Sequence, residues 1–412
     1  MSKTVAVIGA GAIGVCTALS LRRDGHDVLL IERQGTGEGA SFGNGSVISE
    51  EAVVPIATPG IWKKVPRMLL DPLGPLALRW SYLPKLTPWL LRFLLASRTE
   101  KVEEITGHLA ALMEGSLAAF EPLLEMAGEP DFIRKTGWAC VYETERGFAD
   151  DEEYRQLQAR HGVRFDILGP EELRQLEPAL APHLKKGVFY PDVGYALNNF
   201  RLVQLFAEAF EKAGGRLLRA EVRDFEIGPE GPVAVLTDKG RQAFDAVVVA
   251  AGAWSRPLAE RLGAPTLLDT ERGYHMHYPE PGIAPRLPVY STERAFVATP
   301  LEHGLRVAGT VELGGLKAPP NWERAKILER NVSRIYPGLE TQGGKPWMGF
   351  RPSMPDSLPV IGRSPRHANA FLAFGHGHCG LMLSARTGAL IADMVAGRGT
   401  PIDMNPYRPD RF

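Results

Sequence analysis

Three glycines and one glutamate near the start of the sequence have the types and spacing of a dinucleotide-binding site. The run GAGAIG places Gly9, Gly11 and Gly14 directly after an apolar segment, residues 4–9. The first glycine permits a tight turn, the second lets the backbone approach a pyrophosphate, and the third lets a helix pack closely on a strand. Glu32 ends the next apolar run and can accept hydrogen bonds from both ribose hydroxyls. The pattern favours NAD or FAD over NADP.

These side chains require a strand–helix–strand unit to position them. The β-branched run 4–9 predicts a buried strand, residues 12–23 predict a helix that Gly25 closes, and residues 27–31 predict a second strand. The start of the helix would offer unpaired N–H groups and a positive dipole end to the phosphates.

The segment after Glu32 helps to distinguish an FAD site from an NAD site. Residues 35–46 read GTGEGASFGNGS, where an NAD domain usually continues into another helix. A loop of small residues suits close approach of the backbone to a second cofactor portion, such as an isoalloxazine ring. The alternative is a flexible surface linker.

Later segments predict a return to the nucleotide domain. A helix is expected over 199–213, a strand over 215–222, and a buried strand over 244–250 that leads into AGAWS. Residues 371–374 predict a further strand, followed by the loop GHGHCG and a helix over 381–396. The start of that helix can stabilise negative charge on a reduced flavin.

Composition narrows the class of protein. The chain has 47 Lys and Arg against 48 Asp and Glu, which argues against a nucleic-acid binder. Cys16, Cys140 and Cys379 are too far apart for a disulfide framework or a metal site, which indicates a reducing compartment. Neither a signal peptide nor an apolar run of membrane-spanning length is evident, so a cytoplasmic protein is expected.

The order of the motifs carries a family resemblance. VAVIGAGAIG, GASFGNGSVIS, VVVAAGAWS, GFRPSMPDSLPVIGR and GHGHCGLMLSARTGALIADMVAG follow one another along the chain. The sequence resembles the FAD-dependent amino-acid oxidoreductases of the D-amino acid oxidase fold. More narrowly, it is similar to the D-amino acid dehydrogenase small-subunit group, including D-hydroxyproline and D-proline dehydrogenases.

The resemblance implies an α/β fold in which two domains are interleaved. A Rossmann-like FAD-binding domain would comprise residues 1–60, 195–270 and 348–412. An α+β substrate domain on a mixed or antiparallel sheet would comprise residues 61–194 and 271–347. Within the latter, Ile105, Leu109, Leu112, Ser116, Phe120 and Leu124 predict one core-facing helix that ends at Gly128.

The resemblance also implies site residues. Arg351 of GFRP would clamp the substrate carboxylate, which a guanidinium fork matches bidentately; a structural pair with an acid such as Asp356 is the alternative. Tyr274 is a candidate second carboxylate contact or a core aromatic. His376 and His378 are candidates for proton handling or for structural roles. Cys379 is expected to be a packed residue, with FAD bound non-covalently.

Residues of several segments would hold the cofactor. In the first thirty-three residues and the glycine-rich loop they are Gly9, Gly11, Ile13, Gly14, Glu32, Arg33, Ser41, Asn44, Gly45 and Ser46. In the later segments they are Val222, Ala251, Gly252, Trp254, Gly377, Gly380, Leu381 and Met382.

One insert departs from a plain flavin fold. Residues 61–98 hold seven Lys or Arg, a single acid, Asp71, and three of the seven tryptophans, Trp62, Trp80 and Trp89. The insert is interpreted either as a cover over the substrate pocket or as a peripheral membrane contact on the inner membrane face. The family includes dehydrogenases that pass electrons to a quinone.

The sequence therefore predicts hydride transfer from the Cα of a D-amino or D-imino acid, of the D-proline, hydroxy-D-proline or D-alanine type, to flavin N5. Electrons would pass to a quinone or to an artificial dye. A flavin 2-hydroxyacid dehydrogenase and a non-catalytic flavoprotein subunit are the alternatives. A homo- or hetero-oligomer is compatible with this prediction.

Overall fold

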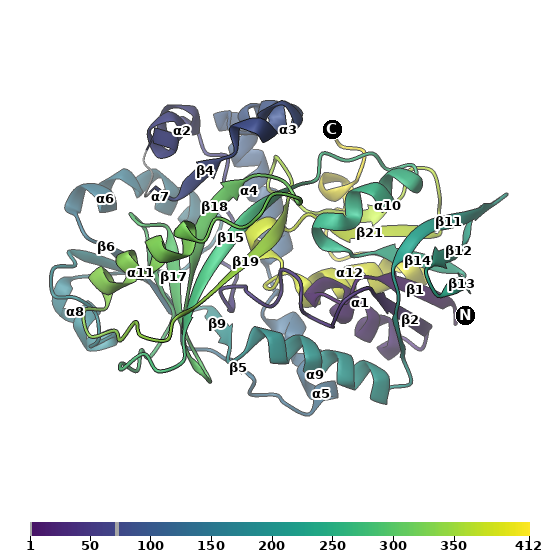
Figure 1. The fold of residues 1–412 in the computed structure, drawn as a ribbon, viewed down its shortest axis with the longest axis horizontal. Coiled ribbons are helices and arrows are strands. Elements are labelled where there is room, and N and C mark those ends of the chain that lie inside the picture. Colours follow the sequence, from purple (N-terminus) through teal and green to yellow (C-terminus); the bar gives the residue numbers. More distant parts are fainter. Residues whose placement is uncertain (1, 71–73) are drawn as a thin grey trace.

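Two large β-sheets lie side by side in the computed structural model (Figure 1). It describes residues 2–70 and 74–412, and within residues 61–70 it describes only the side chains of Ile61, Trp62, Lys63, Val65 and Leu69. Asp71 of the insert lies outside the described residues, as do the side chains of Lys64 and Arg67.

The first sheet is the predicted Rossmann-like sheet. Its six strands run in the order β10–β2–β1–β14–β21–β20, all parallel except β20. Their bounds are β1 Thr4–Ile8, β2 Asp27–Glu32, β10 Arg216–Arg219, β14 Ala246–Val249, β20 Val360–Arg363 and β21 Ala370–Phe374. The central strands are apolar on both faces because helices or a second sheet cover each face.

Three helices cover one face of this sheet, and a smaller sheet covers the other. α1 (Ala12–Arg23), α9 (Asn199–Lys212) and α12 (Ser384–Ala396) share one apolar cluster. The opposite face packs on α10 (Ser255–Arg261) and on the antiparallel sheet of β11 (Val222–Gly228), β12 (Gly231–Thr237) and β13 (Gly240–Ala243).

The second sheet is mixed and has nine strands, as expected for the substrate domain. Eight run in the order β19–β15–β18–β17–β16–β6–β8–β7, and β4 pairs in parallel with β18. Their bounds are β4 Leu76–Leu78, β6 Trp138–Tyr142, β7 Asp166–Leu168, β8 Lys186–Tyr190, β15 Asp269–Tyr278, β16 Val289–Ser291, β17 Phe296–Leu301, β18 Gly304–Leu313 and β19 Lys345–Ser353. α11 (Glu323–Ile335) packs on one face, and β19 spans the domain boundary predicted at residue 348.

Smaller elements connect the two sheets. β3 (Val47–Ser49), β9 (Val193–Ala196) and β5 (Ile133–Arg134) form a three-stranded sheet. The remaining helices are α2 Ile61–Leu70, α3 Leu83–Ala96, α4 Thr99–Met113, α5 Glu121–Ala127, α6 Glu145–Asp150, α7 Glu152–Arg160 and α8 Pro170–Leu176.

Two predicted elements are divided in the structure. The helix expected to end at Gly128 is broken between α4 and α5, where Gly115 adopts a φ of 70°. All six of its predicted core residues are nevertheless buried. The strand expected over 215–222 ends at Arg219, because the chain leaves β2 after Ala220 donates to the Glu32 carbonyl, and β11 then starts a separate sheet.

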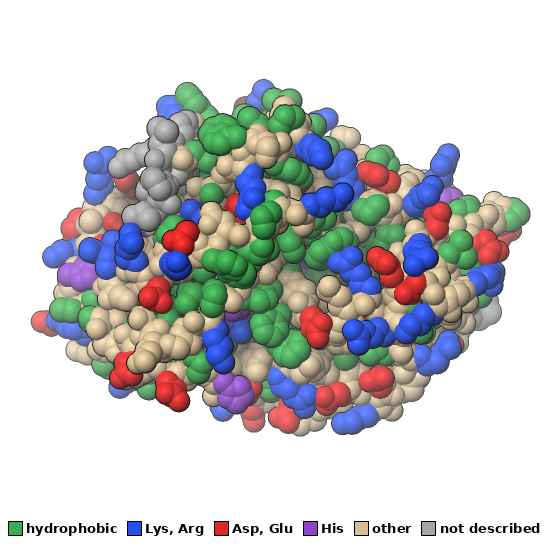
Figure 2. Space-filling model, in the orientation of Figure 1, with side chains coloured by type: hydrophobic (Ala, Val, Ile, Leu, Met, Phe, Trp, Pro, Cys, Tyr) green, Lys and Arg blue, Asp and Glu red, His purple; other side chains and the backbone are tan. Residues whose placement is uncertain are grey.

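The insert has one face on the protein and one in solvent. β4 adds to the large sheet, and Trp89 Nε1 of α3 donates to the Ser353 carbonyl (3.2 Å). Trp62, Trp80 and Leu91 are exposed. Figure 2 shows hydrophobic and basic side chains together at the top of the molecule, where Figure 1 places α2 and α3. Among the described residues, no helix is both long enough and apolar enough to cross a bilayer.

Candidate active site

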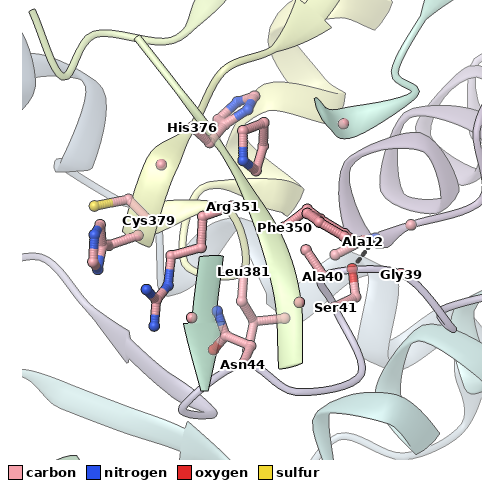
Figure 3. A pocket seen from close by; sticks show the side chains of 18 of the residues that line it. Ala12, Gly39, Ala40, Ser41, Asn44, Phe350, Arg351, His376, Cys379 and Leu381 are labelled. Atoms are coloured by element: carbon pink, nitrogen blue, oxygen red, sulfur yellow. Dashed lines mark hydrogen bonds between the residues drawn. The ribbon is translucent and has the colours of Figure 1, made fainter. Parts of the chain in front are cut away.

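A cavity of about 1120 Å³ lies between the two large sheets and collects nearly all the predicted site residues. It begins at the carboxyl ends of β1 and β2 and extends to β19 and to the loop that follows β21 (Figure 3). The predicted residues that line it are Gly9, Gly11, Ile13, Glu32, Arg33, Ser41, Asn44, Gly45, Val222, Ala251, Gly252, Trp254, Arg351, Gly377, His378, Gly380, Leu381 and Met382.

The carboxylate of Glu32 is fixed at one end of this cavity. It accepts hydrogen bonds from the backbone N–H groups of Ala10 and Gln34, both at 2.8 Å. The guanidinium of the neighbouring Arg33 lies 4.2 Å from the ring centre of Trp254. These contacts hold an acid where the ribose of a dinucleotide would lie, with Val222 nearby for the adenine.

The turn between β1 and α1 is shaped for a pyrophosphate. Gly9 has a φ of 103°, and a Cβ on Gly14 would overlap the Gly9 carbonyl oxygen, so Gly14 packs the helix on the strand and does not line the cavity. Gly11 caps α1 without a side-chain hydrogen bond, and Ser41 Oγ accepts from the Ala12 N–H at 2.9 Å (Figure 3). The bare backbone and the open helix start fit the phosphates of FAD.

The glycine-rich loop is ordered by internal hydrogen bonds. Asn44 Oδ1 accepts from the Ser46 N–H (2.9 Å), and Thr299 Oγ1 donates to the Gly45 carbonyl (2.7 Å). Ser46 does not line the cavity: it is buried at a φ of 63° and its hydroxyl donates to Asn199 Oδ1. Ser46 thus shapes the loop, and the predicted contact with the cofactor is corrected.

Arg351 extends from β19 into the cavity (Figure 3). Its guanidinium lies over Gly273 of β15, where any Cβ would overlap it, and its Nη1 donates to the Thr310 carbonyl at 3.0 Å. Burial lowers the pKa of Arg351, and the charge of Glu271 raises it in part. Asp356 is not the partner of Arg351, because it pairs with Arg411 at 2.8 Å.

A carboxylate–histidine pair stands beside Arg351. His378 Nε2 lies 2.8 Å from Glu271 Oε2, and Ser353 Oγ donates to Glu271 Oε1 at 2.6 Å. Burial would raise the pKa of Glu271, but the hydrogen bonds from His378 and Ser353, together with the charges of His378 and Arg351, lower it to about 2. Sequence reasoning does not identify Glu271, because its partner His378 is 107 residues away and no motif connects the two.

Tyr274 does not reach the cavity. It alternates with Gly273 along β15 and points to the opposite face of the sheet, under α11. Its hydroxyl donates to Glu312 Oε2 (2.5 Å) and accepts from the Asn321 N–H (2.9 Å). The prediction of a substrate contact is therefore corrected, and Tyr274 is a core aromatic.

Two further residues of the loop after β21 line the cavity. His376 is buried with Nε2 3.0 Å from Thr387 Oγ1, and burial lowers its pKa to about 3. Burial, and to a lesser extent the charge of Glu51, raises the pKa of the Cys379 thiol to about 12. Both are held uncharged at neutral pH, which favours packing roles over proton transfer or thiolate chemistry.

A group of aromatic residues that the sequence did not reveal forms another wall of the cavity. Its members come from four different elements, so no spacing along the chain relates them. They are Trp138, Tyr142, Tyr154, Tyr190 and Tyr290.

The Rossmann-like sheet, the glycine-lined cavity and the arginine that extends into it together define an FAD-dependent oxidoreductase. Residues 4–394 match the family described as DAO, FAD dependent oxidoreductase, and the chain belongs to this family. It is 41% identical to a D-amino-acid oxidase of Bradyrhizobium diazoefficiens, over 99% of this chain and 98% of that protein. It is 31% identical to a D-amino acid dehydrogenase of Paramagnetospirillum magneticum, again over 99% and 98%.

Solved structures share the fold. L-proline dehydrogenase from P. horikoshii superposes with a TM-score of 0.76 at 21% identity, covering 100% of this chain and 98% of that one. Glycine oxidase from Geobacillus kaustophilus gives a TM-score of 0.75 at 22% identity, covering 100% and 99%. The predicted fold class and cofactor are confirmed.

Proposed function

We propose that the protein oxidises a D-amino or D-imino acid at Cα, with electrons passed from FAD to a separate acceptor. The observation that carries this proposal is the Arg351 guanidinium, half-buried over Gly273 and lining the same cavity as the loop 375–382. A planar fork in this position suits a carboxylate, which amino acids and imino acids share. The relatives named D-amino-acid oxidase and dehydrogenase support the same substrate class.

Bound FAD supplies the oxidant, accepting a hydride from the substrate Cα. The residues of this chain orient the substrate: Arg351 holds the acid end, which fixes the direction of the Cα–H bond. Glu271 balances the charge of Arg351. The substrate ammonium must lose a proton before an imine can form, and His378 is the exposed titratable side chain beside Arg351 that can accept it. The imino product then hydrolyses in water.

Anaerobic reduction of the flavin by a substrate panel tests this function. D-proline, hydroxy-D-proline and D-alanine should bleach the yellow holoenzyme, and their L-enantiomers should bleach it far more slowly. Bleaching by lactate or 2-hydroxyglutarate alone would assign a 2-hydroxyacid dehydrogenase, and bleaching by no compound would favour a non-catalytic subunit. A colourless protein that binds NAD would contradict the flavin site itself.

Release of the cofactor on denaturation tests the non-covalent mode of binding. The raised pKa of Cys379 leaves little thiolate to form a bond to the flavin. Acid-precipitated protein should therefore leave all of the yellow colour in the supernatant. Colour that stays with the pellet would indicate a covalent link.

We also propose that the insert contacts an anionic membrane surface, where a quinone could accept the electrons. Its exposed apolar residues are Trp62, Trp80, Leu91, Leu94 and Leu95. Its exposed cations are Lys63, Lys85, Arg92 and Arg98. An exposed surface that joins tryptophan and leucine with Lys and Arg is typical of helices that lie in the membrane interface. The insert also reaches the site, because Pro75 lines the cavity, so the two interpretations of the insert are compatible.

A further inference from the structure

The cavity continues past Arg351 into a space with aromatic walls, which we call the aromatic chamber. Its walls are Trp138 and Tyr142 of β6, Tyr190 of β8, Tyr290 of β16 and Tyr154 of α7. The ring of Trp138 lies 5.7 Å from that of Tyr290 and 6.4 Å from that of Tyr190, between ring centres. Tyr154 is 36% exposed although it lines the cavity, so part of its surface lacks a protein neighbour. The aromatic chamber is therefore a part of the cavity that is walled by rings.

A buried carboxyl group stands at the chamber. Glu51 is 7% exposed and lines the cavity; its Oε1 accepts from Ser49 Oγ (3.2 Å), and its Oε2 accepts from Gln158 Nε2 (3.1 Å). Gln158 is held in turn by the Tyr190 hydroxyl at 2.9 Å. Glu51 also acts electrostatically on Cys379, which links the chamber to the loop beside Arg351. The carboxyl is thus positioned by the chamber wall itself.

Two carboxyl groups line this end of the cavity. Asp151 lines it together with Glu51. Among the described residues that line the cavity, the cations besides Arg351 are Arg33, Arg223 and Arg261, which lie at the end with Glu32 and Val222. Arg155 does not line the cavity; its Nη1 donates to the Tyr142 hydroxyl at 3.5 Å, and its Nη2 pairs with Glu152 at 2.7 Å.

Tyrosine and tryptophan faces attract cations, and the attraction grows when water is excluded. Glu51 has no cationic partner among the described residues, and such a buried carboxyl can form a charge-assisted hydrogen bond with a cationic ligand. Burial raises the pKa of Glu51 to about 7 despite its two hydrogen bonds. An incoming cation would favour the ionised form of Glu51 and lower this pKa.

We propose that the aromatic chamber binds the cationic side chain, ammonium or guanidinium, of the amino-acid substrate, with Glu51 as its counter-ion. This inference rests on the proposed function, in which Arg351 holds the carboxylate at the other end of the same molecule. The substrate class would then be basic D-amino acids, with small and cyclic ones as poorer substrates.

The test compares D-lysine with D-norleucine, which has the same carbon chain and no ammonium group. The holoenzyme should show a kcat/KM for D-lysine at least roughly tenfold above that for D-norleucine. Glu51→Gln keeps the size and the hydrogen-bonding groups of the side chain but removes the charge, and should lower this ratio about tenfold. Glu50→Gln is the matched control: Glu50 lies outside the cavity and accepts from the Leu117 N–H, so the ratio should not change.

A second variant tests the walls in case Glu51→Gln fails to fold. Tyr290→Leu removes a ring and should lower the same ratio, whereas Tyr290→Phe keeps the ring and should largely retain it. A wild-type preference for D-norleucine, or a ratio unchanged in both Glu51→Gln and Tyr290→Leu, would overturn the inference while leaving the proposed function intact. If no D-amino acid of either panel reduces the flavin, the proposed function itself fails.

Discussion

Arg351 has no carboxylate partner within salt-bridge distance among the described residues. Its hydrogen-bonded partner is the Thr310 carbonyl, so much of its donor capacity faces the cavity. A half-buried cation whose donors are only partly satisfied is costly to the fold. The cost is explained if a substrate carboxylate completes the pair.

Arg351→Ala should therefore raise KM by roughly ten- to hundredfold, because a charge-assisted hydrogen bond contributes about 1.5–3 kcal/mol. FAD should stay bound, since Glu32 and the turn at Gly9 and Gly11, which fit its ribose and pyrophosphate, belong to the other sheet. Steady-state kinetics and the flavin absorbance per protein measure the two effects. Arg216→Ala, which removes an exposed guanidinium 3.4 Å from Asp27, is the control. Wild-type kinetics in Arg351→Ala would show that the carboxylate binds elsewhere.

Glu271 should make the free energy of unfolding fall as the pH becomes acidic. Its pKa is about 2 in the folded protein against an ordinary value of 4.5, because the bonds and charges of its partners outweigh burial. The unfolded chain therefore takes up a proton first, and the stabilisation is lost as the pH falls from about 4.5 towards 2. Between about pH 6 and pH 3.5 the wild type should lose roughly 1 kcal/mol through this group.

Glu271→Gln cannot titrate, so the free energy of unfolding of this variant should fall less over the same interval. Urea unfolding at several pH values measures the difference. Parallel pH profiles for the two proteins would contradict the lowered pKa of Glu271.

At the scale of elements, local patterns and long-range contacts differ in how far the sequence predicts them. β1, α1 and β2 follow from glycine positions and apolar runs, since their contacts are local. The break at Gly115 was missed, because a helical pattern of apolar residues continues across it. The partner of His378 and the walls of the aromatic chamber come from strands distant in the chain, so only the tertiary fold assembles them. The predicted substrate contact of Tyr274 is wrong because successive residues of a strand point to opposite faces of the sheet, so Gly273 faces the cavity and Tyr274 does not.

Two glycines near the turn between β1 and α1 have different roles. Gly11 leaves room for the cofactor, and Gly14 lets α1 pack on the strand. In Gly11→Val, a Cβ at this position has only Ser41 Oγ near it, at 3.4 Å, but the added methyl groups would project towards the pyrophosphate site. This variant should fold and lose FAD. In Gly14→Ala, the new Cβ would overlap the Gly9 carbonyl, so the thermal midpoint should fall. Circular dichroism and flavin content distinguish the two outcomes, and a Gly11→Val protein that retains FAD would contradict the assignment.

The pairing of β15 with β19 positions Arg351 over Gly273. In Gly273→Ala the new Cβ would overlap the guanidinium and displace it, so KM should rise at least roughly tenfold with the arginine still present. Gly107→Ala is the matched control, because its Cβ would meet His161 at an ordinary 3.7 Å in a helix outside the cavity. Unchanged KM in Gly273→Ala would mean that the observed position of the guanidinium is not the productive one.

For the whole molecule, the site depends on two sheets that each supply one side of the cavity. The glycine-lined end comes from the six-stranded sheet, and Arg351, Glu271 and the aromatic chamber come from the nine-stranded one. The insert extends from the cavity to the molecular surface. Pro75 lines the cavity, and one side of α3 is open to solvent. The electron acceptor of the flavin therefore depends on which partner binds the exposed side of the insert.

Contact with an anionic membrane is the prediction that follows for the insert. Trp80 and Trp62 expose 69% and 59% of their surfaces, and Lys85 and Arg92 of α3 lie on the same insert. The protein should float with vesicles that contain phosphatidylglycerol at low salt, and less with neutral vesicles or at high salt, because salt screens the attraction. Trp80→Ser and the pair Lys85→Glu with Arg92→Glu should each weaken flotation. Trp322→Ser, at a tryptophan 45% exposed outside the insert, should not. If the wild-type protein fails to float at low salt, the surface has another partner.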